Sequence, residues 1–223
     1  MIRVVVIAGT PVDTEMGVEY LARRSSEYCM PVCDPLYRPV AEDCDAQVRF
    51  QYSDGENKRR RLDEIFDPAI AEGVEDFFIY CISLSGAFDL ETYAAEKGVK
   101  VYTPLRIYRN LGRKYSRVGL IAAHNMSAYN IEKTLLEVNP EMYVIGSGNM
   151  AIVSAIEAGK APADIARECG IAHFVRYIED CGCEALILGC THFPYIREEL
   201  DKLCTIPVID PADEMFSAMT GLK

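Results

Sequence analysis

Short apolar runs alternate with longer helical periods along the whole chain, and this alternation limits the fold more than any other feature of the sequence. Such alternation predicts an α/β fold with mostly parallel sheets and helices on both faces. Ligands of open parallel sheets bind beyond the carboxyl ends of the strands, so the residues that follow each strand are the candidates for a functional site. The runs that we expect to form strands are residues 2–7, 27–31, 77–80, 101–102, 117–121, 142–145, 185–188 and 208–209.

The sequence also contains a weak internal repeat. "IRVVVIAGT" leads, after several elements, to a strand followed by Cys81, and "SRVGLIAAH" leads in the same way to a strand followed by Cys190. The separations are similar, with 78 positions from Arg3 to Cys81 (81 − 3) and 73 from Arg117 to Cys190 (190 − 117). The repeat therefore predicts two lobes of like plan, each of which carries one of these cysteines.

We expect both lobes to be doubly wound, with an active-site cleft between them. The N-terminal lobe would comprise residues 1–97, joined by a returning segment at 208–223, and the C-terminal lobe would comprise residues 98–207. The boundary is placed where the sequence between 97 and 116 loses its clear period.

Charge and composition exclude several classes of partner. Half of the 223 residues are apolar, which is enough to bury a core, and no apolar run has the length of a membrane span. The formal net charge of −11 argues against nucleic acid and anionic membranes, because phosphate binding requires an excess of Lys and Arg on one face. The first residues read as a strand without a charged leader, so we expect a cytoplasmic protein.

The nine cysteines should be reduced thiols in such a protein. Cys81 and Cys190 differ from the rest, because each follows an apolar run and has small polar neighbours, in "FFIYCISLSG" and "ALILGCTHFP". The cysteines that we expect to be small apolar core residues are Cys29, Cys44, Cys169 and Cys204.

The longer motif "ALILGCTHFPYIREEL" resembles the C-terminal signature of the glutamate racemases and of the wider aspartate/glutamate racemase superfamily. "CISLSG" stands where that family has its first cysteine, "PVDTEMG" resembles its Asp-Ser-Gly turn, and "AIVSAIEAG" resembles its Val-Glu-Glu-Gly segment. These motifs follow in the family's order and cover nearly the whole chain. The resemblance implies an amino-acid racemase that needs no cofactor and no metal and acts on a small acidic amino acid or a related small acid.

The resemblance also implies roles for individual residues. Racemisation removes a proton from one face of the α-carbon and delivers one to the other, and thiols suit both tasks because they ionise near neutral pH. Cys81 and Cys190 would serve the two faces, with Asp13 beside the first thiol. His192 is chosen from its spacing instead, because it stands two positions beyond Cys190 and in a strand-to-helix turn both side chains can point into the same cleft. Glu157 aligns with a functional glutamate of the family, although it also reads as a helix-surface acid. The residues expected to bind the substrate's charged groups are Thr14, Ser83, Ser85 and Thr191.

One departure from the family pattern leaves the activity open. Ile82 stands where the family usually has Asn, whose amide is suited to a substrate carboxylate. The alternatives are a hydantoin racemase or maleate isomerase type of activity, and a small-acid binding protein that has lost turnover. A homodimer also stays open.

Two further motifs are expected to be coincidental. "GSGNMA" at residues 146–151 fits the Gly-x-Gly-x-x-Gly/Ala fingerprint of dinucleotide sites, but the residues that follow read as helix where a second strand should lie. Cys181 and Cys183, with Cys190 and His192, are zinc-type ligands at a spacing that fits no zinc-finger pattern.

Overall fold

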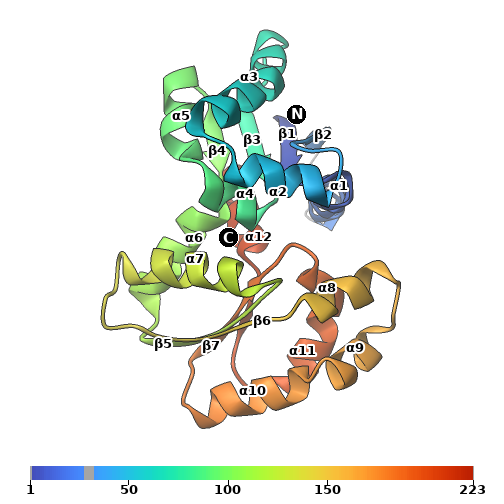
Figure 1. Cartoon of the computed structure of the whole chain (residues 1–223), viewed down its shortest axis with the longest axis vertical. Helices are drawn as coiled ribbons and strands as arrows, with labels where there is room; N and C mark the ends of the chain where they lie inside the picture. The colour runs from blue at the N-terminus through green and yellow to red at the C-terminus, as the bar shows by residue number, and fades with distance from the viewer. Residues whose placement is uncertain (1, 28–32, 223) are drawn as a thin grey trace. The chain divides into compact units, whose positions relative to one another are not determined.

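The computed structural model describes residues 2–27 and 33–222, and it has the α/β fold that the sequence predicts (Figure 1). The chain divides into two compact units, Met1–Pro104 with Ala212–Lys223, and Leu105–Pro211. Each unit contains one parallel four-stranded sheet, with the order β2-β1-β3-β4 in the first and β6-β5-β7-β8 in the second. Counted within its own unit, each sheet has the strand order 2-1-3-4, which confirms the prediction of two similar lobes.

The first unit is built around β1, whose residues 4–8 are fully buried. A strand that is covered on both faces reads as a continuous apolar run, as "VVVIA" does here. The predicted strand at 27–31 lies outside the described residues except for Glu27, which ends α1, and the observed strand β2 at 33–39 was not predicted because its two prolines and charged residues break the apolar run. The strands are β1 (Ile2–Ala8), β2 (Cys33–Pro39), β3 (Asp76–Ile79) and β4 (Lys100–Tyr102). The helices are α1 (Pro11–Glu27), α2 (Cys44–Tyr52), α3 (Gly55–Ala71), α4 (Ile82–Ala87), α5 (Leu90–Lys97) and α12 (Pro211–Thr220).

Helix α12 completes the first unit from the far end of the sequence. The Tyr20 hydroxyl on α1 donates a hydrogen bond of 2.8 Å to Asp213, and the Arg24 guanidinium lies 3.6 Å from the same carboxylate. Met215 and Phe216 are each only 1% exposed. The first unit is therefore discontinuous in sequence, with the whole second unit inserted into it.

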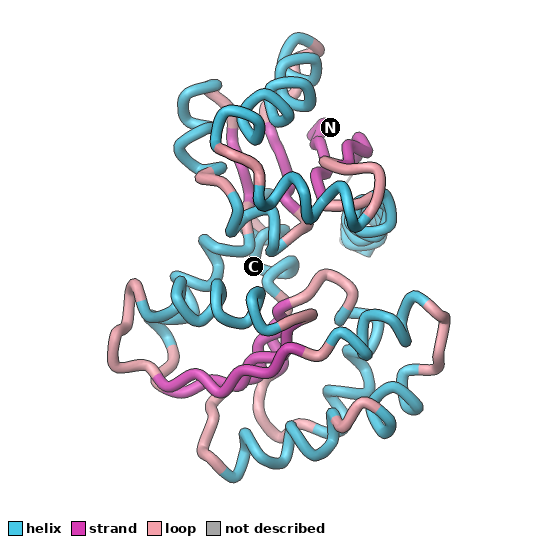
Figure 2. The backbone as a smooth tube through the Cα atoms, in the orientation of Figure 1, coloured by secondary structure: helices cyan, strands magenta, loops and turns pink. Residues whose placement is uncertain are grey.

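The second unit repeats the plan with a more helical connection between its second and third strands. The strands are β5 (Arg117–Ala122), β6 (Tyr143–Gly148), β7 (Ala185–Gly189) and β8 (Val208–Ile209). The helical segments are α6 (Pro104–Lys114), α7 (Asn125–Leu136), α8 (Met150–Glu157), α9 (Pro162–Glu168), α10 (Ile171–Asp180), η1 (Phe193–Ile196) and α11 (Arg197–Leu203). In this unit α7 covers one face of the sheet and α10 the other (Figure 2).

Three helices follow the glycine-rich segment at the end of β6. After α8, α9 and α10 the next strand is β7, which begins at Ala185, so no strand follows β6 at the distance that a dinucleotide fingerprint requires. The longest described helices, α1 and α3, have 17 residues each. None of the helices in the described ranges has both the length and the apolar character to cross a membrane.

The close approach of α10 to β5 requires a glycine at position 119. A Cβ atom added to Gly119 would lie 2.3 Å from Ile178 Cδ1, whereas one added to Gly146 on the neighbouring β6 would meet nothing closer than 3.7 Å. We predict that Gly119→Ala lowers the free energy of unfolding by about 1–3 kcal/mol through overpacking. Gly146→Ala, the matched control, should stay within about 0.5 kcal/mol of the parent. Urea unfolding of the three proteins tests this, and equal stability of both variants would contradict the close packing.

Candidate active site

The two sheets carry a thiol at equivalent places. Cys190 directly follows β7, and Cys81 follows β3 after one further residue, Tyr80. β3 and β7 are the third strands of their sheets, and each lies beside the central strand from which the strand order reverses. This carboxyl edge is where doubly wound sheets bind their ligands.

Cys81 is held at the start of α4. Its backbone is extended, with φ −160° and ψ 119°, and the residue is only 4% exposed. Its carbonyl oxygen accepts hydrogen bonds from the Ser85 backbone N–H at 3.2 Å and from the Ser85 hydroxyl at 2.9 Å. The short helix therefore fixes the backbone of Cys81 and leaves the thiol at the edge of the sheet.

Burial and a neighbouring carboxylate keep the Cys81 thiol protonated. Burial and, to a smaller extent, the negative charge of Asp13 on α1 raise its pKa to about 12. Backbone N–H groups of Gly9, Ser83 and Leu84 oppose it, because they favour the thiolate. Asp13 is itself buried. Near neutral pH, Cys81 therefore stays in the thiol form in this environment.

Gln47, which the sequence analysis did not identify, is a further neighbour of this thiol. Its Nε2 lies 3.5 Å from Cys81 Sγ. The residue stands on α2, 34 positions before the cysteine, among residues with no motif of their own. The sequence gives only an indirect sign of this contact, which is the glycine at position 9 after β1. A side chain at that position would collide with the Gln47 amide.

In the second unit Cys190, His192 and Glu157 form a continuous chain of polar contacts. Cys190 Sγ lies 3.6 Å from His192 Nδ1, and His192 Nε2 lies 3.3 Å from Glu157 Oε1 at the end of α8. Cys190 is half-buried and His192 is buried. A thiol next to an imidazole that has a carboxylate within ion-pair distance can pass its proton to the ring. The structure thus brings together three of the predicted residues.

Tyr108, on α6, is a buried polar residue near Cys190 that the sequence analysis also missed. It is fully buried, and its hydroxyl lies 3.5 Å from the carbonyl oxygen of Leu188 on β7. Burial raises the pKa of Tyr108 well above its usual value, with further contributions from the charges of Asp210 and Cys190. This tyrosine therefore stays neutral and packs behind the strand that carries the thiol.

Two of the four predicted substrate-binding residues are engaged in local structure. The fully buried Thr14 hydroxyl donates a 2.7 Å hydrogen bond to the Thr10 carbonyl, and Ser85 donates to Cys81 as described above. The other two are half-buried: Ser83 stands two positions after Cys81, and Thr191 directly follows Cys190.

Ile82 is buried and supplies an apolar side chain at the position where the family that the sequence resembles has an amide.

The other cysteines and histidines lie elsewhere. Cys181 and Cys183 precede β7 and Cys190 follows it, so this strand separates the CGC thiols from Cys190. No group of three or more His, Cys, Asp or Glu side chains in residues 2–27 and 33–222 is placed to hold a metal ion.

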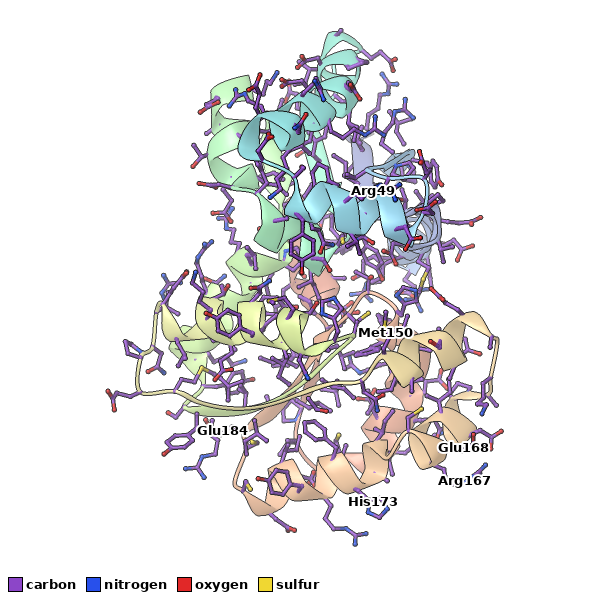
Figure 3. All side chains as sticks on the ribbon, in the orientation of Figure 1. Arg49, Met150, Arg167, Glu168, His173 and Glu184 are labelled. Atoms are coloured by element: carbon purple, nitrogen blue, oxygen red, sulfur yellow. The ribbon has the colours of Figure 1, made fainter. Side chains whose placement is uncertain are left out.

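The two other histidines of the chain both lie in the second unit. His124 caps α7 by accepting a hydrogen bond from the Ser127 N–H at 3.1 Å. His173 lies on α10 (Figure 3).

Cys29, Cys44, Cys169 and Cys204 were expected to be small apolar core residues, and the structure describes the side chains of the last two. Cys169 and Cys204 are partly buried and pack against the apolar core of the second unit. Burial also raises the pKa of Cys204 to about 11, which makes it a weakly reactive thiol. Cys29 and the side chain of Cys44 lie outside the described residues.

Comparison with known proteins gives one family. A family model described as Asp/Glu/Hydantoin racemase matches residues 52–219, more than half of the chain. The glutamate racemase of Limosilactobacillus reuteri (strain DSM 20016) is 35% identical over 105 residues, which cover 45% of this chain and 38% of that protein. The glutamate racemase of Acidothermus cellulolyticus is 27% identical over 154 residues, which cover 67% of this chain and 58% of that protein. The matches thus span less than two thirds of these relatives' own length.

Solved structures share the fold over nearly the whole chain. An aspartate racemase homologue from Pyrococcus horikoshii OT3 has a TM-score of 0.74 at 20% identity, covering 100% of this chain and 99% of that one. Glutamate racemase from Francisella tularensis, in complex with D-glutamate, has a TM-score of 0.68 at 20% identity and covers 99% and 80%. Allantoin racemase from Klebsiella pneumoniae has a TM-score of 0.69 at 15% identity and covers 100% and 89%. At these identities the likeness shows a shared fold.

The different surroundings of the two thiols predict different reactivity. Alkylation requires an accessible thiolate, so the buried Cys81, with its pKa of about 12, should react slowly. Cys190 is half-buried and has an imidazole within 3.6 Å that can accept its proton. We expect iodoacetamide at pH 8 to label Cys190 at least tenfold faster, as measured by peptide mapping at successive times. Equal rates in the folded protein would contradict the assigned environments, and the urea-unfolded protein is the control in which the difference should disappear.

The raised pKa of Cys81 also predicts that the folded protein loses stability at alkaline pH. An unfolded cysteine has a pKa of about 8.5, whereas the pKa of folded Cys81 is about 12. Between these values the unfolded chain releases the proton and the folded chain keeps it, so this contribution is fully present below about pH 8.5 and is lost as the pH rises. At pH 10 the loss should be about 2 kcal/mol. Urea unfolding of the parent and Cys81→Ser should show their difference in stability shrinking from pH 7 to 10, and a constant difference would contradict the raised pKa.

Proposed function

The chain belongs to the Asp/Glu/hydantoin racemase family, and from this premise we propose that it racemises an acidic amino acid without a cofactor, using Cys81 and Cys190 as its acid/base groups. The observation that supports the proposal most strongly is the equivalent place of the two thiols after the third strands of two like sheets. Each thiol has its own neighbours for proton transfer, so each unit contributes one acid/base centre.

Cys190 acts as the base in one direction of the reaction. His192 takes the thiol proton, and the Glu157 carboxylate stabilises the resulting imidazolium across its 3.3 Å contact. The thiolate then removes the α-proton, so that the Cα–H bond breaks and an S–H bond forms. The electron pair stays on the substrate as a carbanion, and no oxidation or reduction takes place.

Cys81 completes the inversion by delivering a proton to the other face. Its raised pKa keeps it in the thiol form that this step requires. When the proton leaves, the backbone N–H groups of Gly9, Ser83 and Leu84 stabilise the thiolate. In the reverse direction the roles exchange, with the Cys81 thiolate as base and the Cys190 thiol as acid. When the α-proton is removed, the two thiols are therefore in opposite protonation states, and transfer of the His192 proton through solvent to the Cys81 thiolate restores the starting state.

Ile82 favours a second candidate activity. A buried apolar side chain offers no hydrogen bond to a substrate carboxylate, so a site lined by Ile82 is better suited to a neutral cyclic substrate than one lined by Asn. Hydantoin-type racemisation, which uses the same proton transfer at a ring carbon, is the corresponding alternative. A maleate isomerase type of reaction and a binding protein without turnover are the further outcomes to be separated by experiment.

A panel of L-amino acids and L-hydantoins distinguishes these activities. Racemisation of aspartate or glutamate should be visible as loss of the circular dichroism signal, and in D₂O the inverted product should carry deuterium at the α-carbon. Turnover of hydantoins but not of amino acids would support hydantoin-type racemisation instead. If calorimetry shows binding of an acidic amino acid but no deuterium is incorporated, the protein binds the amino acid without turning it over, and the proposed racemase activity is rejected.

Replacement of either cysteine should stop racemisation and leave the fold intact. We expect Cys81→Ser and Cys190→Ser each to lower the rate by about 10²–10⁴-fold or more, because a hydroxyl is a far weaker acid than a thiol. Cys169→Ser, at a cysteine whose side chain packs against the core of the second unit, should racemise at nearly the parent rate. Each active-site variant should still eliminate chloride from one enantiomer of β-chloroalanine and not the other, with opposite preferences. Near-parent racemisation by either variant would show that its cysteine is not an acid/base group.

A further inference from the structure

Gln47 approaches Cys81 because the chain is tied to the end of β1 just before α2 begins. The Val40 N–H donates to the Ala8 carbonyl at 2.9 Å, and the Ala41 N–H donates to the Gly9 carbonyl at 3.1 Å. The Asp43 side chain then caps α2. These contacts fix where the helix starts, and its first turns carry Gln47 to a point 3.5 Å from Cys81 Sγ.

Gly9 provides the space in which the Gln47 amide lies. A Cβ atom added at position 9 would be 1.9 Å from Gln47 Nε2 and 2.3 Å from its Cδ. Since real Cβ atoms do not approach other heavy atoms so closely, any side chain here would displace the amide. The contact between Gln47 and Cys81 therefore depends on two features of the fold that are independent of each other, the start of α2 and the absence of a side chain at Gly9.

We propose that Gln47 is a positioning residue for Cys81, whose amide group stabilises the thiol and the thiolate in turn. This inference rests on the proposed two-thiol reaction, in which Cys81 must pass through both states. An amide has N–H groups that donate to a thiolate and a carbonyl oxygen that accepts from a thiol, and rotation about its last torsion exchanges them. Few other side chains of this length offer both without a charge.

The charged groups around Cys81 explain why a neutral partner is needed. From α1, Asp13 places a negative charge close enough to raise the pKa of the thiol. α4, which carries the cysteine at its start, has no charged residue. On α2, Arg49 is exposed and stands two positions beyond Gln47, so it projects from a different side of the helix (Figure 3). A carboxylate in place of Gln47 would add to the effect of Asp13 and hold the thiol in its protonated form.

The test compares Gln47→Glu with the parent, because the two side chains have nearly the same shape. We expect Gln47→Glu to slow iodoacetamide labelling of Cys81 at least tenfold at pH 9–10, which corresponds to a rise of one pKa unit. Gly9→Ala should also slow labelling by displacing the amide, and it keeps the inference testable if Gln47→Glu folds poorly. Gln51→Met, on the same helix, is the control and should label Cys81 at the parent rate.

A kinetic readout separates positioning from a general structural effect. In a Cys190→Ser background, where Cys81 is the remaining base, Gln47→Glu should lower β-chloroalanine elimination at least tenfold. In a Cys81→Ser background, the same substitution should leave elimination by Cys190 unchanged. A parent rate of Cys81 labelling in Gln47→Glu, or an equal loss of elimination in both backgrounds, would overturn the inference. If labelling responds as expected while the parent protein neither racemises nor eliminates, the proposed reaction is wrong and the role of Gln47 toward the thiol stands.

Discussion

The pairing of the third strand with the central strand fixes where each unit carries its cysteine. In the first unit the Tyr80 N–H donates to the Ile7 carbonyl at 2.8 Å, and this bond extends the β1–β3 ladder to the residue before Cys81. In the second unit Gly189 pairs with Ala122, and Cys190 is the next residue. Both ladders are buried, so the backbone positions of the thiols are set by hydrogen bonds that water cannot easily replace. The helices that supply Asp13, Gln47 and Glu157 are arranged around these two points.

The surroundings of the two thiols differ although their backbone positions are alike. The first thiol is buried beside a carboxylate and an amide, and the second is partly exposed beside an imidazole. A symmetric environment would give both groups the same preferred protonation state. Racemisation needs one acid and one base at each moment, so this difference suits the proposed reaction.

Sequence reasoning identified the strands other than β2, the repeated plan and the places of Cys81 and Cys190 after two of the strands, because all of these leave local patterns. Apolar runs mark β1, β3, β5 and β7, and the residue that follows a strand is read directly from the sequence. His192 could be predicted because it stands two positions from Cys190. Gln47 and Tyr108 could not, since their contacts depend on where whole helices dock rather than on any local periodicity. The family resemblance supplied Glu157, which would otherwise read as an ordinary surface acid of α8.

The discontinuity of the first unit has a consequence for synthesis on the ribosome. Residues 105–211 form one uninterrupted unit, so its sheet and core can close as soon as that segment has emerged. The first unit emerges earlier but lacks α12, whose Met215 and Phe216 are almost fully buried in the finished protein. The unit that emerges first is therefore the last to be completed, and until α12 follows, the apolar surface that Met215 and Phe216 cover stays exposed and open to the contacts that chaperones prevent.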